Sequence, residues 1–285
     1  MSSSVKAAFR VCERMAREHY ENFPVASLLI PRDRRPYVAA IYAFARTADD
    51  IADEGGRSPQ ERLRLLEQVD VRLDSAYRGS PEVAVFIAIA ETASRTGIPL
   101  ALLRRLLAAF RMDVTRHRYQ SFDDLLGYCR NSADPVGRLV LHIFGEFREE
   151  LLVQSDSLCT ALQLVNFWQD VVPDLARGRL YIPLEDLGRF GYTEADLAAR
   201  RLDDRFRALM RFEVERTRAM FRRGRDLLRA AVRPLRLELN LTYRGGMAIL
   251  KKIETSGYDV LTDRPTLSTW DKIVLLASAG LRRTP

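Results

Sequence analysis

The sequence predicts an all-α protein, and three observations carry this prediction. Apolar residues recur at spacings of three and four through most of the chain, for example between Leu100 and Phe110, and strand-like alternation is nearly absent. Hydrophobic residues make up 47% of the 285 residues, which is enough for a large core. No polar linker, repeat or low-complexity tract divides the chain. We therefore expect a single domain over residues 1–285, a helical bundle around a central cavity.

Glycine and proline indicate where the predicted helices begin and end. Residues 1–20 have the pattern of an amphipathic helix, and roughly eight to ten helical stretches of ordinary length are expected in all. The breaks between them are predicted at residues 24–36, 55–56, 79–81, 97–99, 178–183, 188–191, 233–234 and 257–265.

The charge balance is basic, with 45 Lys and Arg residues against 38 Asp and Glu residues and a net charge of +7. Such a charge suits nucleic acid, an anionic membrane face or a diphosphate ligand, so it does not choose among them. Three widely spaced cysteines fit a reducing compartment. No signal peptide is recognised, and the apolar runs fall short of the ~20 residues that span a bilayer. We expect a cytoplasmic protein, and peripheral contact with the inner membrane face is compatible with its basic charge.

Two aspartate-rich segments carry the strongest functional signal, DDIADE at residues 49–54 and NFWQDVVPD at residues 166–174. In each, two aspartates four residues apart share one helical face. Such stacks destabilise an isolated helix by roughly 0.2 to 0.5 kcal/mol per pair, so a cation is expected to offset them. Mg²⁺ binds through a few carboxylates together with substrate phosphates. Two facing acidic walls therefore predict a diphosphate held between them.

The first segment extends a stripe that begins at Tyr42 and continues through Arg46 to Asp49 or Asp50. Arg46 either binds phosphate or neutralises the two aspartates beside it. The plain alternative is a solvated helix face laced with salt bridges.

The second segment places Gln163, Asn166, Asp170 and Asp174 on one stripe, and all four offer oxygen ligands. Pro173 lacks a backbone N–H and its ring collides with the carbonyl four residues earlier, so Asp174 is expected past a kink. A basic turn around Gly178 follows, which either folds over a diphosphate or simply decorates a helix C-terminus.

A third motif is YCRNSADPVG, residues 128–137. Pro135 and Gly137 are expected to bend the helix there and to let Tyr128 turn its hydroxyl inward. The alternative is a core tyrosine whose hydroxyl satisfies a hydrogen bond.

Together these motifs resemble the squalene and phytoene synthase family of head-to-head prenyl synthases. The matching segments occur in order over nearly the whole chain: YAFARTADDIADE from Tyr42, YCRNSADPVG from Tyr128, NFWQDVVPDLARGRLYIP from Asn166 and GYDVLTDRPTLSTWDK from Gly257. The resemblance implies an isoprenoid synthase fold, a prenyl diphosphate substrate and Mg²⁺ as cofactor.

The resemblance also implies roles for individual residues. The Mg²⁺ ligands would be Asp49, Asp53, Asn166, Asp170 and Asp174, with Asp50 in support. Phosphate would be held by Arg46, Arg179, Arg264 and Lys272, and Tyr42 would also line the substrate site. Our hypothesis is that Tyr128, with Gln163 or Gln169 nearby, orients a water molecule or takes its proton.

Within the family the likeness is strongest to bacterial hydroxysqualene synthases, on ENFPVAS at residues 21–27, SADPVGR at residues 132–138 and NFWQD. Phytoene and presqualene diphosphate synthases typically carry an arginine where this chain has Gln169. The implied reaction is conversion of presqualene diphosphate to hydroxysqualene with release of diphosphate, in squalene and hopanoid biosynthesis. The alternative is condensation of two farnesyl or geranylgeranyl diphosphates to presqualene diphosphate, squalene or phytoene.

Two expectations concern partners. The chain has no Gly-rich dinucleotide fingerprint, so reduction to squalene is not expected here and a downstream hydroxysqualene reductase is the implied partner. Nucleic acid is not expected, because only the net charge supports it and the carboxylate stacks would repel a phosphate backbone.

Overall fold

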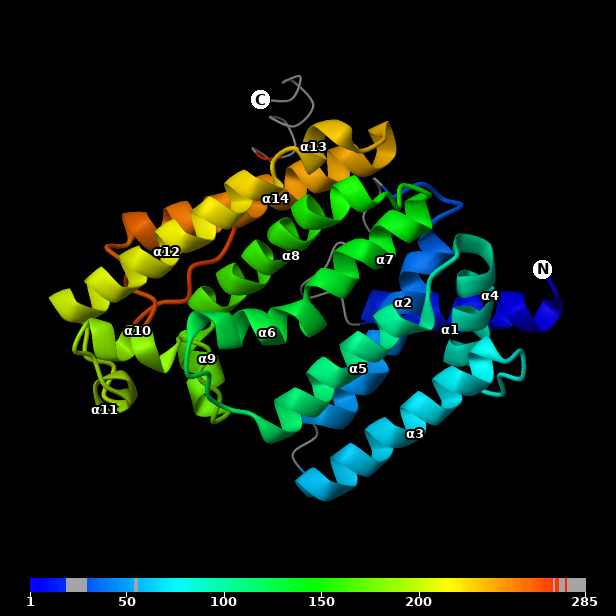
Figure 1. The fold of residues 1–285 in the computed structure, drawn as a ribbon, viewed down its shortest axis with the longest axis horizontal. Helices are drawn as coiled ribbons and strands as arrows, with labels where there is room; N and C mark the ends of the chain where they lie inside the picture. The colour runs from blue at the N-terminus through cyan, green and yellow to red at the C-terminus, as the bar shows by residue number, and fades with distance from the viewer. Residues whose placement is uncertain (19–29, 54–55, 269, 272–274, 276–285) are drawn as a thin grey trace. The chain divides into compact units, whose positions relative to one another are not determined.

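The computed structural model describes residues 1–18, 30–53, 56–268, 270–271 and 275, and over these residues it is helical with no strand (Figure 1). The predicted all-α class is confirmed. The described part contains ten helices of 11 residues or more, the upper end of the expected range, and four shorter ones. The chain divides into two compact units, residues 1–115 with 135–148, and residues 116–134 with 149–285. The single domain stays a prediction.

The first unit is built around α2, which carries the first acidic segment. Its helices are α1 (Ser3–Glu18), α2 (Arg35–Asp53), α3 (Pro59–Tyr77), α4 (Ala84–Thr96), α5 (Leu100–Thr115) and most of α7 (Asp134–Phe144). The α2 helix contacts α1, α3, α4 and α5. This close approach is possible because α2 buries a row of alanines, Ala39, Ala40, Ala43, Ala48 and Ala52.

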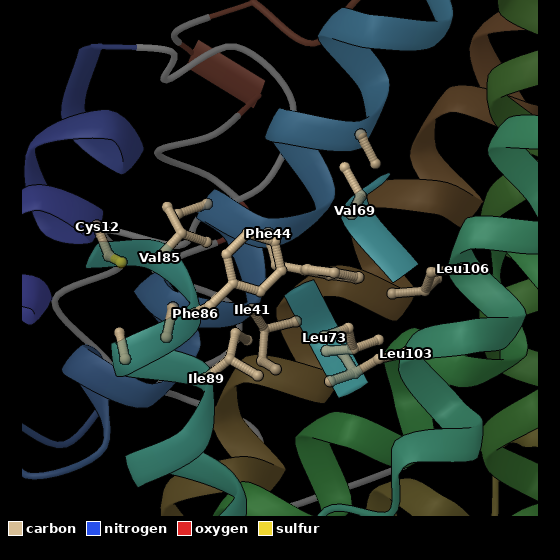
Figure 2. Packing of buried hydrophobic residues seen from close by; sticks show 14 of the residues in the cluster. Cys12, Ile41, Phe44, Val69, Leu73, Val85, Phe86, Ile89, Leu103 and Leu106 are labelled. Atoms are coloured by element: carbon tan, nitrogen blue, oxygen red, sulfur yellow. The ribbon is translucent and has the colours of Figure 1, made fainter. Parts of the chain in front are cut away.

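Phe44 lies at the centre of this unit's core (Figure 2). Its ring is fully buried and meets Phe86 of α4 edge to face, with ring centroids 6.4 Å apart. Leu73 of α3 and Leu103 of α5 belong to the same cluster and are also fully buried. Contacts on several sides therefore fix the rotation of α2, and with it the direction in which its polar stripe faces.

The second unit is built around α8, which carries the second acidic segment. Its helices are α6 (Phe122–Ser132), α8 (Glu149–Gln169), α9 (Val171–Ala176), α10 (Leu184–Arg189), α11 (Glu194–Ala198), α12 (Asp204–Gly224), α13 (Leu227–Ala230) and α14 (Arg233–Thr255). The α8 helix contacts α6, α9, α12, α13 and α14. Trp168 of α8 is fully buried, and its Nε1 donates to Thr217 Oγ1 of α12 at 2.8 Å. This buried bond fixes α8 against α12.

The predicted breaks match the helix ends in several places. Gly97 ends α4 with a left-handed φ of 69°, and α5 begins at Leu100, just after the predicted break. Near Pro135, where a bend is expected, the helix is interrupted: α6 ends at Ser132 and α7 begins at Asp134. The break predicted at residues 233–234 coincides with the start of α14 at Arg233, where proline occupies the first turn.

A buried ionic cluster joins α10 to α12. Arg216 donates to both carboxylate oxygens of Asp186, at 2.9 and 3.0 Å. Glu213, one turn earlier on α12, has no exposed surface, and burial raises the pKa of its carboxyl group well above the ordinary value. The cluster attaches α10, and the chain leading into it, to the long helix α12.

Two adjacent glycines on α14 allow a sharp test of packing. A Cβ added at Gly246 would collide with the ring of Phe221, which is fully buried, and would press on Leu162 at 3.1 Å. A Cβ at Gly245 would meet only Leu267, at 3.8 Å. We expect Gly246→Ala to destabilise the protein by about 1 to 3 kcal/mol through overpacking.

The matched control is Gly245→Ala, which should be neutral or stabilise by up to about 1 kcal/mol because alanine favours helix. Urea denaturation followed by circular dichroism measures both. Equal effects of the two substitutions would contradict the close packing of α14 against α12.

Candidate functional site

The first acidic stripe lies on α2, as predicted. Tyr42 is half-buried, and Arg46 follows one turn later with its guanidinium 2.7 Å from Asp50 and 3.7 Å from Asp49. The side chains of Asp49 and Asp50 are 43% and 49% exposed. Asp53 is the last residue of α2 and is exposed, whereas Glu54 lies outside the described residues. The stripe therefore presents its carboxylates at the C-terminal end of a well-packed helix.

Arg46 pairs with two aspartates and also has a buried N–H group that meets no acceptor among the described residues. Burial alone would lower the pKa of Arg46, but the hydrogen bond to Asp50 and the charges of Asp50 and Asp49 outweigh it, so this pKa lies above its ordinary value. Its Nε is buried and meets no acceptor among the described residues. Buried donors are normally satisfied, so this N–H is suited to an anionic ligand. Neutralising the aspartates and holding a phosphate are thus compatible roles for Arg46.

The second acidic segment crosses the end of α8. Gln163 is half-buried and Asn166 is exposed, both on α8. The helix ends at Gln169, and Asp170 has a φ of −103° and a ψ of 20° before α9 begins. Even so, Asp170 N bonds Asn166 O at 2.9 Å and Asp174 N bonds Asp170 O at 2.8 Å. The four-residue spacing is therefore kept across the break.

Pro173 explains where this break falls. It stands four residues after Gln169, so it offers no N–H to that carbonyl and its ring would strike it. The chain responds by departing from helical geometry at Asp170, between the two residues in conflict. The predicted kink is confirmed, and Asp174 lies beyond it on the short helix α9.

A segment that follows α14 closes over the end of α8. Arg264 donates from Nε and Nη2 to the two carboxylate oxygens of Asp170, the second bond at 3.0 Å. The hydrogen bond to Asp170 raises the pKa of Arg264 above its ordinary value, against the smaller effect of burial. Beside this pair, Gln169 is buried and donates from Nε2 to Pro265 O at 2.5 Å. Asp170 and Arg264, 94 residues apart in sequence, thus form one two-pronged ion pair.

The basic turn after α9 is held by backbone contacts. Gly178 adopts a left-handed φ of 81°, and Arg179 N bonds back to Asp174 O at 2.8 Å. Arg118 donates to the carbonyl of Gly178 at 2.6 Å. Arg179 is therefore placed one turn from Asp174, beyond the helix break at Asp170.

Tyr128 lies inside an aromatic cluster of the second unit. Only 5% of Tyr128 is exposed, and its ring lies 5.7 Å from that of Tyr119, 5.8 Å from Tyr181 and 6.1 Å from Phe167. Phe167 and Tyr181 stack in parallel at 3.8 Å. Backbone hydrogen bonds from Leu180 N to His117 O and from Leu184 N to Tyr119 O join the segment that carries Tyr181 to the loop that carries Tyr119. The cluster is an electron-rich wall next to the acidic end of α8.

Sequence reasoning did not single out Tyr119. It lies in the loop at residues 116–121, where no helical period relates it to Tyr128. Tyr181 and Phe167 lie in segments distant from Tyr128, and no sequence pattern relates either of them to it. Lys272 lies outside the described residues.

Comparison with known proteins identifies the family. The family model described as squalene/phytoene synthase matches residues 16–271, most of the chain. The chain belongs to this family.

Relatives within the squalene/phytoene synthase family carry more than one activity. A phytoene synthase of Arthrospira platensis is 32% identical over 288 aligned positions, which cover 96% of this chain and 93% of that protein. A hydroxysqualene synthase of Zymomonas mobilis is 35% identical over 251 positions, covering 87% of this chain and 81% of that protein. The crystal structure of squalene synthase HpnC from Alicyclobacillus acidocaldarius superposes with a TM-score of 0.86 at 41% identity, covering 90% of this chain and 97% of that one.

The metal ligands predicted for this family member divide between the units. Asp49 and Asp53 belong to the first, whereas Asn166, Asp170 and Asp174 belong to the second. Within the described residues no three or more Cys, His, Asp or Glu side chains are gathered closely enough to hold a metal. The donor set is nevertheless all oxygen, which fits Mg²⁺, and its role stays a prediction.

Arg264 offers a test of whether Asp170 binds a cation. Any metal ion must compete with the guanidinium for this carboxylate, so removing the charge should favour the metal. Because the pair is partly exposed, we expect Arg264→Gln to tighten binding of Mn²⁺ alone about two- to fivefold, measured by electron paramagnetic resonance without diphosphate. Arg177→Gln, at an exposed position in the neighbouring turn, is the control and should have little effect. Unchanged or weaker binding in Arg264→Gln would exclude Asp170 as a ligand.

Proposed function

We propose that this member of the squalene/phytoene synthase family converts presqualene diphosphate to hydroxysqualene, with release of diphosphate. The reaction would belong to squalene and hopanoid biosynthesis, and a separate hydroxysqualene reductase would consume the product. The similarity to a hydroxysqualene synthase and to squalene synthase HpnC supports this assignment.

The observation that carries the choice within the family is Gln169. Its neutral amide stands beside the Asp170–Arg264 pair and donates to the Pro265 carbonyl. An arginine in this place would bring a second guanidinium next to Asp170 and change how the diphosphate is held. A neutral residue at position 169 therefore supports a reaction different from the one that the synthases with arginine at this position catalyse.

The chain's own charged groups account for recognition of the diphosphate. Arg46, Arg179 and Arg264 would bind phosphate oxygens, and the buried Nε of Arg46 supports its part in this. Asp49, Asp53, Asn166, Asp170 and Asp174 would hold Mg²⁺, with Asp50 in support. The chemistry that bound Mg²⁺ supplies is neutralisation of the charge that develops on the departing diphosphate.

The aromatic cluster suits the cation that remains on the hydrocarbon. The rings of Tyr128, Phe167 and Tyr181 offer π faces, which stabilise positive charge, and they exclude bulk water. Water must then reach the cation at one position. We assign its orientation, or the uptake of its proton, to Tyr128 with Gln163 or Gln169, and Tyr42 to the substrate site.

A second candidate is head-to-head condensation of two prenyl diphosphates. It is favoured by the 96% coverage of this chain in the match to a phytoene synthase. The two reactions would share the metal and phosphate residues, so the products distinguish them.

Product analysis tests the proposal directly. Purified protein is incubated with Mg²⁺ and farnesyl, geranylgeranyl or presqualene diphosphate, without NADPH, and the lipids are identified by mass spectrometry. We expect hydroxysqualene from presqualene diphosphate only. Phytoene or presqualene diphosphate as product would establish the condensation instead.

Asp49→Asn and Asp170→Asn should abolish turnover with an unchanged circular dichroism spectrum, and retained activity would contradict the metal assignment.

Tyr128→Phe tests the water-handling role. The ring and its packing are kept, so the loss of the hydroxyl alone should lower turnover about 10²- to 10⁴-fold or shift product away from the alcohol. Tyr119→Phe, in the same cluster, is the matched control and should retain the product. Unchanged turnover and product in Tyr128→Phe would remove this residue from the mechanism.

A further inference from the structure

A dense group of arginines surrounds the turn that joins α12 to α14, coloured yellow to orange around α13 in Figure 1. We call residues 222–237 the arginine elbow. This stretch contains a single acidic residue, Asp226, against six arginines, Arg222, Arg223, Arg225, Arg229, Arg233 and Arg236. Five of the six are exposed, and Arg236 is half-buried with its Nε bonded to the Ala231 carbonyl.

Most arginines of the elbow differ from Arg216 and Arg218 of α12 in their charged partners. Arg216 and Arg218, earlier on the helix, pair with carboxylates. By contrast, no salt bridge joins Arg222, Arg223, Arg225 or Arg233 to another residue in the part of the chain that the structure describes. The positive charge of the elbow is therefore directed at solvent.

Helix stability does not explain this arrangement. A helix C-terminus favours cations, which accounts for Arg222 and Arg223 in the last turn of α12. Arg233, however, begins α14, and a cation at a helix N-terminus is unfavourable. A charge that costs stability and has no partner within the described chain points to a partner outside it.

Apolar side chains are exposed among these arginines. Val232 and Leu237 are 37% and 36% exposed, whereas Leu227, Leu228 and Leu235 are buried beneath them and anchor the elbow. Val153 of α8 is 70% exposed, and the carbonyl of the next residue, Gln154, lies 3.0 Å from where a Cβ on Gly224 would be. The elbow therefore combines a rigid support, a cationic surface and protruding aliphatic groups.

We infer that the arginine elbow, with Val153 beside it, docks this protein on a membrane surface rich in anionic phospholipid. Guanidinium groups match lipid phosphates, and the aliphatic side chains fit the boundary between head groups and acyl chains. A nucleic acid would use the arginines but would leave the exposed valines and leucine without an apolar environment. No described helix is long and apolar enough to cross a bilayer, so the contact would be peripheral. The inference does not depend on which prenyl reaction the protein performs.

Vesicle sedimentation tests the inference with the whole chain. The wild-type protein is expected to bind vesicles of phosphatidylglycerol mixed with phosphatidylcholine and to leave pure phosphatidylcholine vesicles unbound. Each arginine near an anionic surface contributes about a fivefold gain in binding. The triple variant Arg223→Glu, Arg225→Glu and Arg233→Glu should therefore bind at least about 100-fold more weakly.

The matched control is the triple variant Arg14→Glu, Arg64→Glu and Arg72→Glu, in exposed positions on α1 and α3. It lowers the net charge by the same amount and should change binding less than about threefold. A second variant, Val232→Ser with Leu237→Ser, keeps every charge and should weaken binding several-fold, whereas Val71→Ser with Val83→Ser, also at exposed valines, should not. Thermal unfolding by circular dichroism verifies that each variant is folded.

Three outcomes would overturn the inference. Equal losses in the two arginine variants would mean that only net charge matters. No binding of wild-type protein to phosphatidylglycerol vesicles would exclude a lipid partner. Elbow-dependent binding to duplex DNA, without vesicle binding, would assign the surface to nucleic acid.

Discussion

The candidate site depends on how the repulsion between like charges is offset along two helical segments. Aspartates stacked four residues apart repel one another by a few tenths of a kcal/mol, and partial burial makes the repulsion stronger. In each unit an arginine offsets it, Arg46 on α2 and Arg264 at the end of α8. The two arginines differ in how far they lie in sequence from the aspartates that they neutralise. Arg46 is local in sequence and stays on its own helix, whereas Arg264 is supplied by a distant segment that must first fold against α8.

The features that could be predicted from the sequence are those that depend on residues close together in the chain. The α2 stripe depends only on helical period, so Tyr42, Arg46 and Asp49 were placed correctly by spacing. The break at Asp170 depends on proline stereochemistry four residues away, which is also local. Arg264 was brought to the site only by family resemblance, because no local pattern relates it to Asp170.

Other features arise from contacts between segments distant in the chain, and no sequence pattern predicts them. Tyr119 stacks on Tyr181 because backbone hydrogen bonds join their two segments, and loops have no period from which to infer such a contact. The arginine elbow was visible in the sequence only as part of a basic net charge. Which of its arginines lack carboxylate partners depends on the packing of α12, α13 and α14, and cannot be counted from composition.

The pairing of Arg264 with Asp170 has a consequence for how any cation enters. A guanidinium stays protonated throughout the physiological range, and its bond to Asp170 strengthens that tendency. Entry of a metal therefore cannot proceed by titrating the arginine away. For a cation to bind Asp170, the guanidinium would have to swing aside as a whole, and its freed N–H groups would then be available to a phosphate oxygen. Cation binding at this carboxylate would thus be an exchange of partners, in which Asp170 faces a positive charge both before and after the exchange.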